Sequence, residues 1–446
     1  MFDHVVVLML ENNSFDRMLG FLPDADGVDP AVPRTNPDLG PNAPPVRQAP
    51  TTARNIAADP DHNLNDVLGQ IADGMQGFVA SFARTYPNSP PAERQEIMAY
   101  YAPGVLPALH TLAEQFVVCD SWFSSVPGPT WPNRFFAHSG TSLGHVDMPE
   151  GVFTPGLHAY DQTTICDLLH RAGKSFAVYY GDFPQSLVLL HQLDHLDAYK
   201  KMPEFYADVR AAESAFPAYV FIEPTYFGAT PDDQHPPHDV LRGDALIASV
   251  YDALKSNPAL FARTLFVILY DEHGGFFDHV EPPASVPPDS HTAIFAFNQY
   301  GVRVPAVLVS PLLDHAVLPE TFDHTSLLRF LIDGWNVGGG AAAPLGARAA
   351  QAADFAPLLR LRTSPRSLPE LPLAPAPRIA ESVPALNAQQ SALLGFSQYL
   401  ESLIRDPALR AQLAARAHEA MGDPRTQGNL ARDRLEAFLG ERRGGA

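Results

Sequence analysis

Residues 5–16 read VVVLMLENNSFD and place Glu11 and Asn12 directly after an unbroken apolar run. Residues 265–280 read LFVILYDEHGGFFDHV and repeat this arrangement, with Asp271 and Glu272 after the run. Near-continuous hydrophobicity over about six residues is typical of a strand that is buried on both faces of a parallel sheet. The two stretches therefore predict two buried strands, each ending in a polar cluster.

Three further apolar runs, at residues 176–180, 219–222 and 304–309, have the same character and predict further parallel strands. Stretches with helical periodicity lie between the runs, at residues 164–172 and 244–255. Strands that alternate with helices indicate the α/β class, with a mostly parallel sheet sandwiched between helices.

Composition divides the chain into three parts. We interpret residues 1–340 as one large α/β domain and the Ala- and Pro-rich residues 341–380 as a linker. In residues 381–446, apolar side chains recur at helical spacing, which predicts a small helical tail with a role in packing. Pro-rich residues 24–50 predict a long surface loop.

The charge balance excludes one class of function. The chain has 30 Lys and Arg against 50 Asp and Glu, a net charge of −20. Nucleic-acid binding needs clustered Lys and Arg, so we do not expect it, and docking on anionic lipid is disfavoured for the same reason. No protein partner is evident.

The remaining bulk features concern compartment and cysteines. No apolar stretch reaches the length of a membrane span, and no signal peptide is visible, which predicts a cytoplasmic protein. Export with a removed leader is the alternative. Cys119 and Cys166 are expected to be buried free thiols, with a disulfide as the alternative.

The polar clusters after the two strands suit a divalent cation. Ligands in open α/β sheets gather beyond the carboxyl ends of the strands, and carboxylate and carboxamide oxygens are hard donors. Glu11, Asn12, Asp271 and Glu272 are therefore candidate ligands, and Gly274-Gly275 would permit a tight reversal beside them. The alternatives are a helix cap for the first pair and a solvated loop for the second.

Thr130 is the candidate nucleophile. It lies in residues 128–134, GPTWPNR, where Pro132 suits the first position of a helix. Thr130 would then face the positive end of the helix dipole, where phosphate binds well, and a nearby cation would promote loss of its proton. The alternative is that Thr130 merely caps the helix.

Four histidines adjoin acidic or polar residues: His62, His235, His238 and His279. A phosphoryl-transfer site needs donors for the phosphate oxygens and an acid for the leaving oxygen, and histidine serves both purposes near neutral pH. For any one of them the alternative is a surface or supporting position.

Four motifs together resemble the phosphoesterase family of bacterial phospholipases C, plant non-specific phospholipases C and related bacterial acid phosphatases. They are Glu-Asn-x-Ser-Phe-Asp at residues 11–16, Thr-x-Pro-Asn-Arg at 130–134, Asp-Glu-x-x-Gly-x-x-Asp-His-Val at 271–280, and Gly-x-Arg-Val-Pro at 301–305 followed by Ser-Pro. They occur in family order across residues 2–335. One departure is Asn13, where relatives commonly carry Arg.

The resemblance implies a core like that of alkaline phosphatase and a role for each matching residue. The implied metal ligands are Glu11, Asn12, Thr130, Asp271 and Glu272; the implied catalytic residues are Thr130, His235 and His62; and the implied phosphate contacts are His62, His235, His238, His279 and Asn133. All-oxygen ligation favours Mg, Ca or Mn, and Zn stays open.

We therefore expect a metal-dependent phosphoric ester hydrolase that resembles phospholipase C. Thr130 would form a phosphothreonine intermediate, and His235 or His62 would protonate the leaving alkoxide. The expected substrate is a small phosphoester or a phospholipid headgroup. The alternatives are a broad-specificity acid phosphatase that uses the same groups and a non-catalytic binding protein on the same fold.

Overall fold

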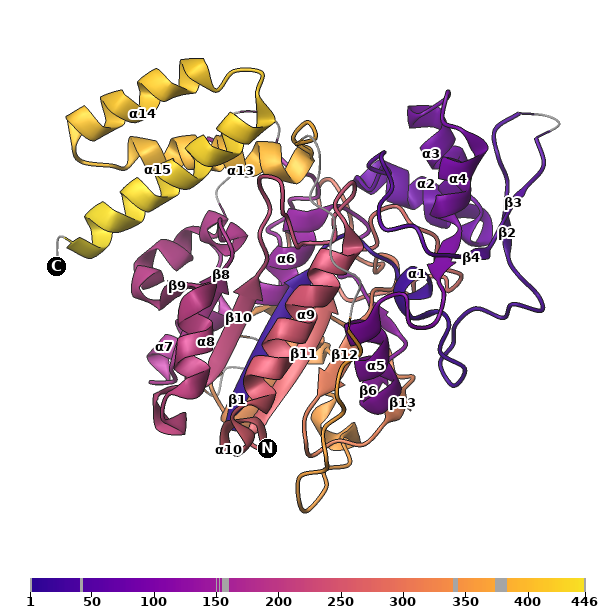
Figure 1. The fold of residues 1–446 in the computed structure, drawn as a ribbon, viewed down its shortest axis with the longest axis horizontal. Coiled ribbons are helices and arrows are strands. Elements are labelled where there is room, and N and C mark those ends of the chain that lie inside the picture. The colour runs from indigo at the N-terminus through magenta and orange to yellow at the C-terminus, as the bar shows by residue number, and fades with distance from the viewer. Residues whose placement is uncertain are drawn as a thin grey trace.

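The computed structural model describes residues 2–40, 43–149, 151, 153–154, 160–339, 344–373 and 383–444. An eight-stranded sheet lies at its centre, with helices on both faces (Figure 1). The strands run in the order β13-β6-β12-β11-β1-β10-β8-β9. They are β1 (His4–Leu10), β6 (Val117–Cys119), β8 (Phe176–Tyr180), β9 (Tyr199–Lys201), β10 (Tyr219–Glu223), β11 (Thr264–Tyr270), β12 (Ala306–Val309) and β13 (Ala316–Leu318). The α/β class is confirmed.

The first strand occupies the middle of this sheet. β1 pairs in parallel with β10 on one side and with β11 on the other. Its residues and those of β11 are all buried, as the unbroken apolar runs require.

One strand runs against the expected direction. β12 is antiparallel to both β11 and β6, whereas residues 304–309 are predicted above to form a parallel strand. Parallel neighbours need a crossover, usually a helix, and residues 271–305 contain no helix. The chain therefore returns directly beside β11.

The helices of the sandwich agree with the expected periodicity. α7 (Ile165–Arg171) begins at a capping box in which Thr164 and Asp167 satisfy each other's backbone N–H groups. α9 (Val240–Lys255) starts four residues earlier than expected, because the Asp239 carboxylate caps it by accepting from the N–H of Leu241. The other helices of this region are α1 (Phe15–Leu19), α2 (Leu64–Met75), α3 (Phe78–Thr85), α4 (Pro91–Ile97), α5 (Pro107–Gln115), α6 (Thr130–Ser139), α8 (Met202–Arg210), α10 (Pro258–Phe261) and α11 (His324–Trp335).

Short elements complete the described chain. Small strands are β2 (Thr35–Asn36), β3 (Val46–Arg47), β4 (Ala49–Thr51), β5 (Ala99–Tyr101), β7 (Trp122–Phe123) and β14 (Phe322–Asp323). The 3₁₀ helices are η1 (Gln185–Val188), η2 (Leu190–Ala198), η3 (Glu213–Ala215) and η4 (Ala356–Leu358). Cys119 and Cys166 are free and buried, as expected. Every helix in the described ranges is too short or too polar to cross a bilayer.

The C-terminal region is helical. The segment expected to be a linker contains a short helix, α12 (Gly346–Gln351), while residues 341–343 and 374–380 of that expectation lie outside the described residues. After it come α13 (Ala388–Ser402), α14 (Pro407–Glu419) and α15 (Pro424–Gly444). These three helices lie over the edge of the sheet at which β1 and β10 end (Figure 1).

Candidate active site

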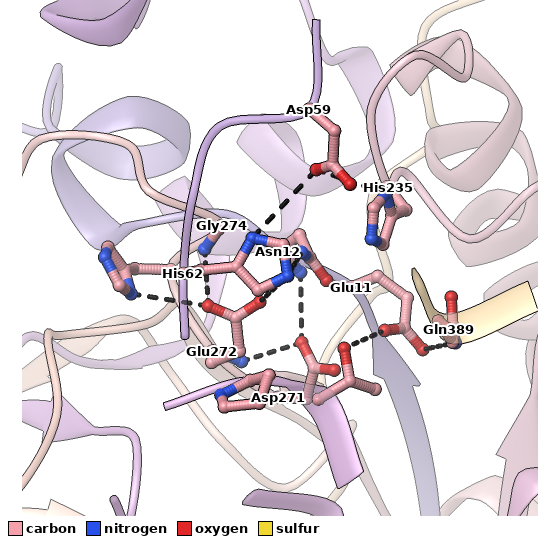
Figure 2. Close-up of polar contacts among 12 residues, drawn as sticks. Glu11, Asn12, Asp59, His62, His235, Asp271, Glu272, Gly274 and Gln389 are labelled. Atoms are coloured by element: carbon pink, nitrogen blue, oxygen red, sulfur yellow. Dashed lines mark hydrogen bonds and ion pairs between the residues drawn. The ribbon is translucent and has the colours of Figure 1, made fainter. Parts of the chain in front are cut away.

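The rim cluster forms where β1 and β11 end side by side. It consists of Glu11, Asn12, Thr130, Asp271 and Glu272, and four of these five residues are 0% exposed, with Thr130 at 1%. The backbone N–H groups of Asn12 and Glu272 both donate to Asp271 Oδ1, at 3.0 and 2.7 Å (Figure 2). Parallel pairing of the two strands thus brings together residues 260 positions apart in sequence, as the motifs predict.

Close backbone approach shapes this rim. Asn12 has a φ of 55°, and Gly274 has a φ of 65°. A Cβ atom on Gly274 would lie 2.3 Å from the backbone oxygen of Asn12, so only glycine fits there. The expected tight reversal is therefore present, and it lets the Gly274 N–H donate to Glu272 Oε2 at 2.7 Å.

Thr130 lies within the first turn of α6, with Pro129 preceding the helix in an extended conformation. The helix therefore begins two residues before the expected Pro132, which occupies its third position; proline tolerates this place because the first N–H groups of a helix have no internal partner. Thr130 Oγ1 donates to Glu11 Oε2 at 3.5 Å. The hydroxyl therefore faces the carboxylate at the end of β1.

Asn133 differs from its predicted role as a phosphate contact. Its Oδ1 accepts from the N–H of Val126 at 3.0 Å, and its Nδ2 lies 2.9 to 3.1 Å from the carbonyls of Val126, Gly128 and Pro129. The whole carboxamide is engaged in holding the loop ahead of α6. Asn133 thus fixes the position of Thr130 and has no group left for phosphate.

Arg134 supplies positive charge to the rim cluster from the next turn of α6. Its Nη2 donates to Glu11 Oε1 at 2.5 Å, and its Nε lies 3.5 Å from Asp271 Oδ2. Burial raises the pKa of Glu11 well above its usual range, Arg134 opposes that rise and Asp271 adds to it. Arg134 therefore contacts both Glu11 and Asp271, the carboxylates that follow β1 and β11.

Three oxygens of the rim cluster are left without a hydrogen-bond donor. Asn12 Oδ1, Asp271 Oδ2 and Glu272 Oε1 are buried and have no hydrogen-bond partner within the part of the chain that the structure describes. Buried polar atoms are nearly always paired, so each such oxygen needs an explanation. Buried carboxylate and carboxamide oxygens are hard donors of the kind that a divalent cation requires. The residues present thus fit the implied metal.

His62, His235 and Asp59 lie above the rim cluster (Figure 2). His62 Nε2 is 3.3 Å from Asn12 Nδ2 and 4.0 Å from Glu272 Oε1. Burial lowers the pKa of His62, but the nearby carboxylates of Glu272 and Asp59 outweigh this effect and raise the pKa to about 9. His62 therefore carries a positive charge at neutral pH when the rim holds no cation.

His235 shares the carboxylate of Asp59 with His62. Asp59 Oδ1 lies 3.9 Å from Nδ1 of His235 and 4.0 Å from Nδ1 of His62, and the two imidazole rings are 5.9 Å apart. The Nδ1 of His235 is also 2.6 Å from the carbonyl of Pro236. With Nδ1–H donated to that carbonyl, Nε2 is the nitrogen that is left for a substrate.

His238 and His279 stand in different surroundings. His238 Nδ1 lies 2.7 Å from Asp233 Oδ1, and its ring is 6.4 Å from that of His235, so it adjoins the site. His279 does not: its Nδ1 is 3.0 Å from Asp16 and its Nε2 is 3.1 Å from Asp26. The structure therefore separates His279 from the rim cluster.

His279 belongs to a second group, the anchor cluster, made of Asp16, Asp278, His279 and Arg303. Arg303 Nε donates to Asp278 Oδ1 at 2.8 Å, and its Nη2 donates to Asp16 Oδ1 at 3.1 Å. The ligand atoms of Asp16, Asp278 and His279 are close enough together to hold a metal ion. The guanidinium of Arg303 pairs with both carboxylates, and the imidazole of His279, whose pKa is raised to about 8, pairs with Asp16, so we interpret this cluster as structural.

Sequence reasoning missed the polar residues that hold Glu11. Gln185 Nε2 donates to Glu11 Oε1 at 2.8 Å, and Glu223 holds this loop by accepting from the N–H of Gln185 at 2.7 Å. Gln389, from α13, donates to the same Glu11 oxygen at 3.0 Å. Isolated glutamines carry no sequence signal, whereas Arg134 could have been found because it closes the Thr-x-Pro-Asn-Arg motif.

The chain is similar to known proteins over most of its length. The model of the Phosphoesterase family matches residues 2–338. Non-specific phospholipase C6 of Arabidopsis thaliana is 37% identical over 328 residues, which are 69% of this chain and 61% of the plant protein. Non-specific phospholipase C3 of the same plant is 32% identical over 361 residues, 72% of this chain and 67% of that protein. The matched part thus spans about two-thirds of these relatives' length.

A bacterial relative and a solved structure extend the comparison. Phospholipase C B of Mycobacterium tuberculosis strain H37Rv is 29% identical over 389 residues, 74% of this chain and 72% of that protein. The crystal structure of a protein in the alkaline phosphatase superfamily from Vibrio parahaemolyticus matches with a TM-score of 0.35 and 12% identity, covering 55% of this chain and 64% of that chain.

Proposed function

This chain belongs to the Phosphoesterase family, and we propose that it is a metal-dependent phosphoric ester hydrolase that cleaves phosphodiesters in the manner of a phospholipase C. The observation that carries the proposal is the set of three buried oxygens without donors, on Asn12, Asp271 and Glu272, beside the hydroxyl of Thr130. The names of the phospholipase C relatives support the choice of a phosphodiester.

The ligands of the cation would be Glu11, Asn12, Asp271 and Glu272, with the Thr130 hydroxyl beside them. A divalent cation held there would lower the pKa of that hydroxyl and offset the charge that grows on the phosphate oxygens. All these donors are oxygens, which favours Mg, Ca or Mn over softer metals.

Thr130 is proposed as the nucleophile. Its hydroxyl lies in the first turn of α6, where the positive end of the helix dipole favours a phosphate. Attack of Thr130 Oγ1 on phosphorus expels the alcohol and leaves a phosphothreonine, which water then hydrolyses. Glu11 Oε2 is the hydrogen-bond acceptor of that hydroxyl and is placed to take its proton.

The two histidines have separate proposed roles. His62, whose Nε2 lies 3.3 Å from Asn12 Nδ2 beside the proposed ligands, would donate to the non-bridging phosphate oxygens. His235 protonates the leaving alkoxide through Nε2. His62 is also the second candidate for the acid.

The test combines metal dependence with trapping of the intermediate. Metal-free protein is assayed on p-nitrophenylphosphorylcholine and on p-nitrophenyl phosphate, with and without added Mg, Ca or Mn. We expect metal-restored hydrolysis of the diester, and rapid acid quench with a phosphorus-labelled diester should leave label on the peptide that contains Thr130. Hydrolysis of the monoester alone would instead identify a phosphatase.

Variants of Thr130 decide the covalent step. Thr130→Ala should be inactive and unlabelled, while Thr130→Ser should keep partial activity because the hydroxyl remains. Thr363, which is exposed, provides the matched control Thr363→Ala, which should behave as wild type. Wild-type turnover by Thr130→Ala would refute the phosphothreonine intermediate.

A further inference from the structure

The helical tail reaches the rim cluster with its first turn. Gln389, the second residue of α13, is 1% exposed and directs its carboxamide toward Glu11 (Figure 2). Its Nε2 donates to Glu11 Oε1 at 3.0 Å. Asn387, the residue that caps α13, places Nδ2 3.2 Å from Nδ1 of His235. Both residues lie outside the range 2–338 that matches the family model.

The position of Gln389 is fixed by the packing of its own helix. Asn387 and Gln390 form a reciprocal capping box, and Gln390 Nε2 donates to the carbonyl of Tyr226 at 2.5 Å. Further along α13, the ring centroids of Phe396 and Phe153 are 5.0 Å apart. These contacts fix the backbone of Gln389, and its side chain is 1% exposed, so few other orientations of the carboxamide have to be given up when it binds Glu11.

The two oxygens of the Glu11 carboxylate accept different numbers of hydrogen bonds. Oε1 accepts three donors, from Arg134 at 2.5 Å, Gln185 at 2.8 Å and Gln389 at 3.0 Å. Oε2 has the Thr130 hydroxyl at 3.5 Å. Three fixed donors on one oxygen hold the carboxylate in the rotation that turns the other oxygen toward Thr130.

We propose that Gln389 is a positioning residue of the active site, so that the helical tail completes the site instead of only packing against it. This inference rests on the proposed function, in which Glu11 is a metal ligand and the partner of Thr130. Gln389 acts through Glu11, so its loss should disturb the metal and the chemical step more than substrate binding. The carboxamide oxygen of Gln389 is buried without a hydrogen-bond partner among the described residues, so the contact of this carboxamide with Glu11 is made by its N–H donor.

The test replaces the donor while keeping shape and helix propensity. Gln389→Met is compared with Gln398→Met, a matched change on the same helix at a half-buried position. Calorimetric titration of metal-free enzyme with Mn²⁺ and steady-state hydrolysis of p-nitrophenylphosphorylcholine are measured for both. For Gln389→Met we expect Mn²⁺ affinity and kcat to fall by about 10-fold or more, with KM little changed, and for Gln398→Met no change in either.

The opposite result, in which the two variants behave alike, would refute the proposal. If Gln389→Met matched Gln398→Met in Mn²⁺ affinity and kcat, the positioning role would be refuted while the proposed function stood. Should methionine disturb the packing, seen as a lowered melting temperature, Gln389→Ala repeats the comparison against Gln398→Ala.

A third readout separates this inference from the proposed function. If wild type neither bound Mn²⁺ nor hydrolysed the ester, the proposed function would fail. Hydrogen exchange of the peptide covering residues 5–19 would then decide on Gln389: faster exchange in Gln389→Met than in Gln398→Met supports its hold on Glu11, and equal exchange overturns it.

Discussion

The rim cluster and the anchor cluster draw their carboxylates from the same two motifs, residues 11–16 and 271–280, and both are buried. In the anchor cluster every carboxylate oxygen of Asp16 and Asp278 has a donor, two of them from Arg303. In the rim cluster, three oxygens have none within the described chain. Adjacent residues of one motif thus separate into a group that holds the fold and a group that is left open for a ligand.

The different hydrogen bonding of the two clusters indicates how a buried carboxylate should be interpreted. A carboxylate whose oxygens are all paired is already at its energetic minimum, so a ligand would have to displace a donor. A buried carboxylate oxygen that accepts no hydrogen bond costs desolvation free energy, and the folded protein tolerates it only if another interaction offsets that cost. Function is therefore indicated by unpaired atoms more than by the residue types, which the two clusters share.

The sharpest test of this comparison is Asp271→Ala. It removes an open oxygen from the rim cluster, so kcat should fall by roughly 10⁴-fold or more, which corresponds to more than about 5 kcal/mol of transition-state stabilisation. The variant should still fold, although losing the acceptor of the Asn12 and Glu272 N–H groups should cost about 1–3 kcal/mol of unfolding free energy for each group. Asp314→Ala, at an exposed aspartate, is the control. Normal kcat together with normal metal content would break the assignment of the rim cluster.

Arg303→Met tests the anchor cluster and should have the opposite outcome. Removing the guanidinium leaves Asp16 and Asp278 buried without their counter-charge, which typically costs about 3–5 kcal/mol of unfolding free energy. Urea denaturation measures this loss. Arg362→Met, which breaks an exposed pair with Asp314, should cost less than about 1 kcal/mol. A similar small cost at Arg303 would contradict the structural role of the anchor cluster.

A histidine beside the rim cluster gives a smaller and substrate-dependent effect. His235→Ala should slow hydrolysis of alkyl phosphoesters by about 10²-fold more than hydrolysis of nitrophenyl esters, because a nitrophenolate barely needs a proton in order to leave. The ratio of the two kcat/KM values measures this. Equal losses on both substrates would assign His235 to the phosphate oxygens and make His62 the acid.

The smallest expected effect concerns His279 in the anchor cluster. Burial lowers the pKa of His279, but the hydrogen bond to Asp16 and the charge of that residue outweigh this effect and raise the pKa from 6.5 to about 8. Such a group adds stability that is complete below pH 6.5 and is lost as the pH rises through about 8. His279→Gln should therefore cost roughly 2 kcal/mol at pH 6 and little at pH 9, as measured by urea denaturation. A cost for His279→Gln that did not vary with pH would show that its charge is not what holds the cluster.

The fold could be predicted where the sequence contains long apolar runs. β1 and β11 are seven residues each and wholly buried, so their pattern admits few other structures. Three-residue strands such as β6, β9 and β13 give no comparable pattern, because their pairing depends on neighbours far along the chain. The start of α6 was misplaced for a related reason: proline is tolerated at several positions of the first turn.

The candidate site could be predicted in its ligands but not in its supports. Glu11 and Asp271 follow strands that end at one edge of the sheet, so their meeting follows from topology. Gln389 stands 378 positions from Glu11, and a polar residue on an amphipathic helix is ordinarily read as solvent-exposed. His279 was grouped with the wrong partners because its motif does not show that Arg303 would fold back onto it.

The central place of β1 has a consequence for the order in which this protein can assemble. β1 is the first strand along the described chain, yet its partners β10 and β11 end at Glu223 and Tyr270. At a synthesis rate of about 5–20 residues per second, β1 waits on the order of 10 s or longer for both edges to be paired. An unpaired strand with six consecutive apolar residues is prone to aggregate during that time. The nascent chain is therefore expected to depend on chaperones until β11 has left the ribosome.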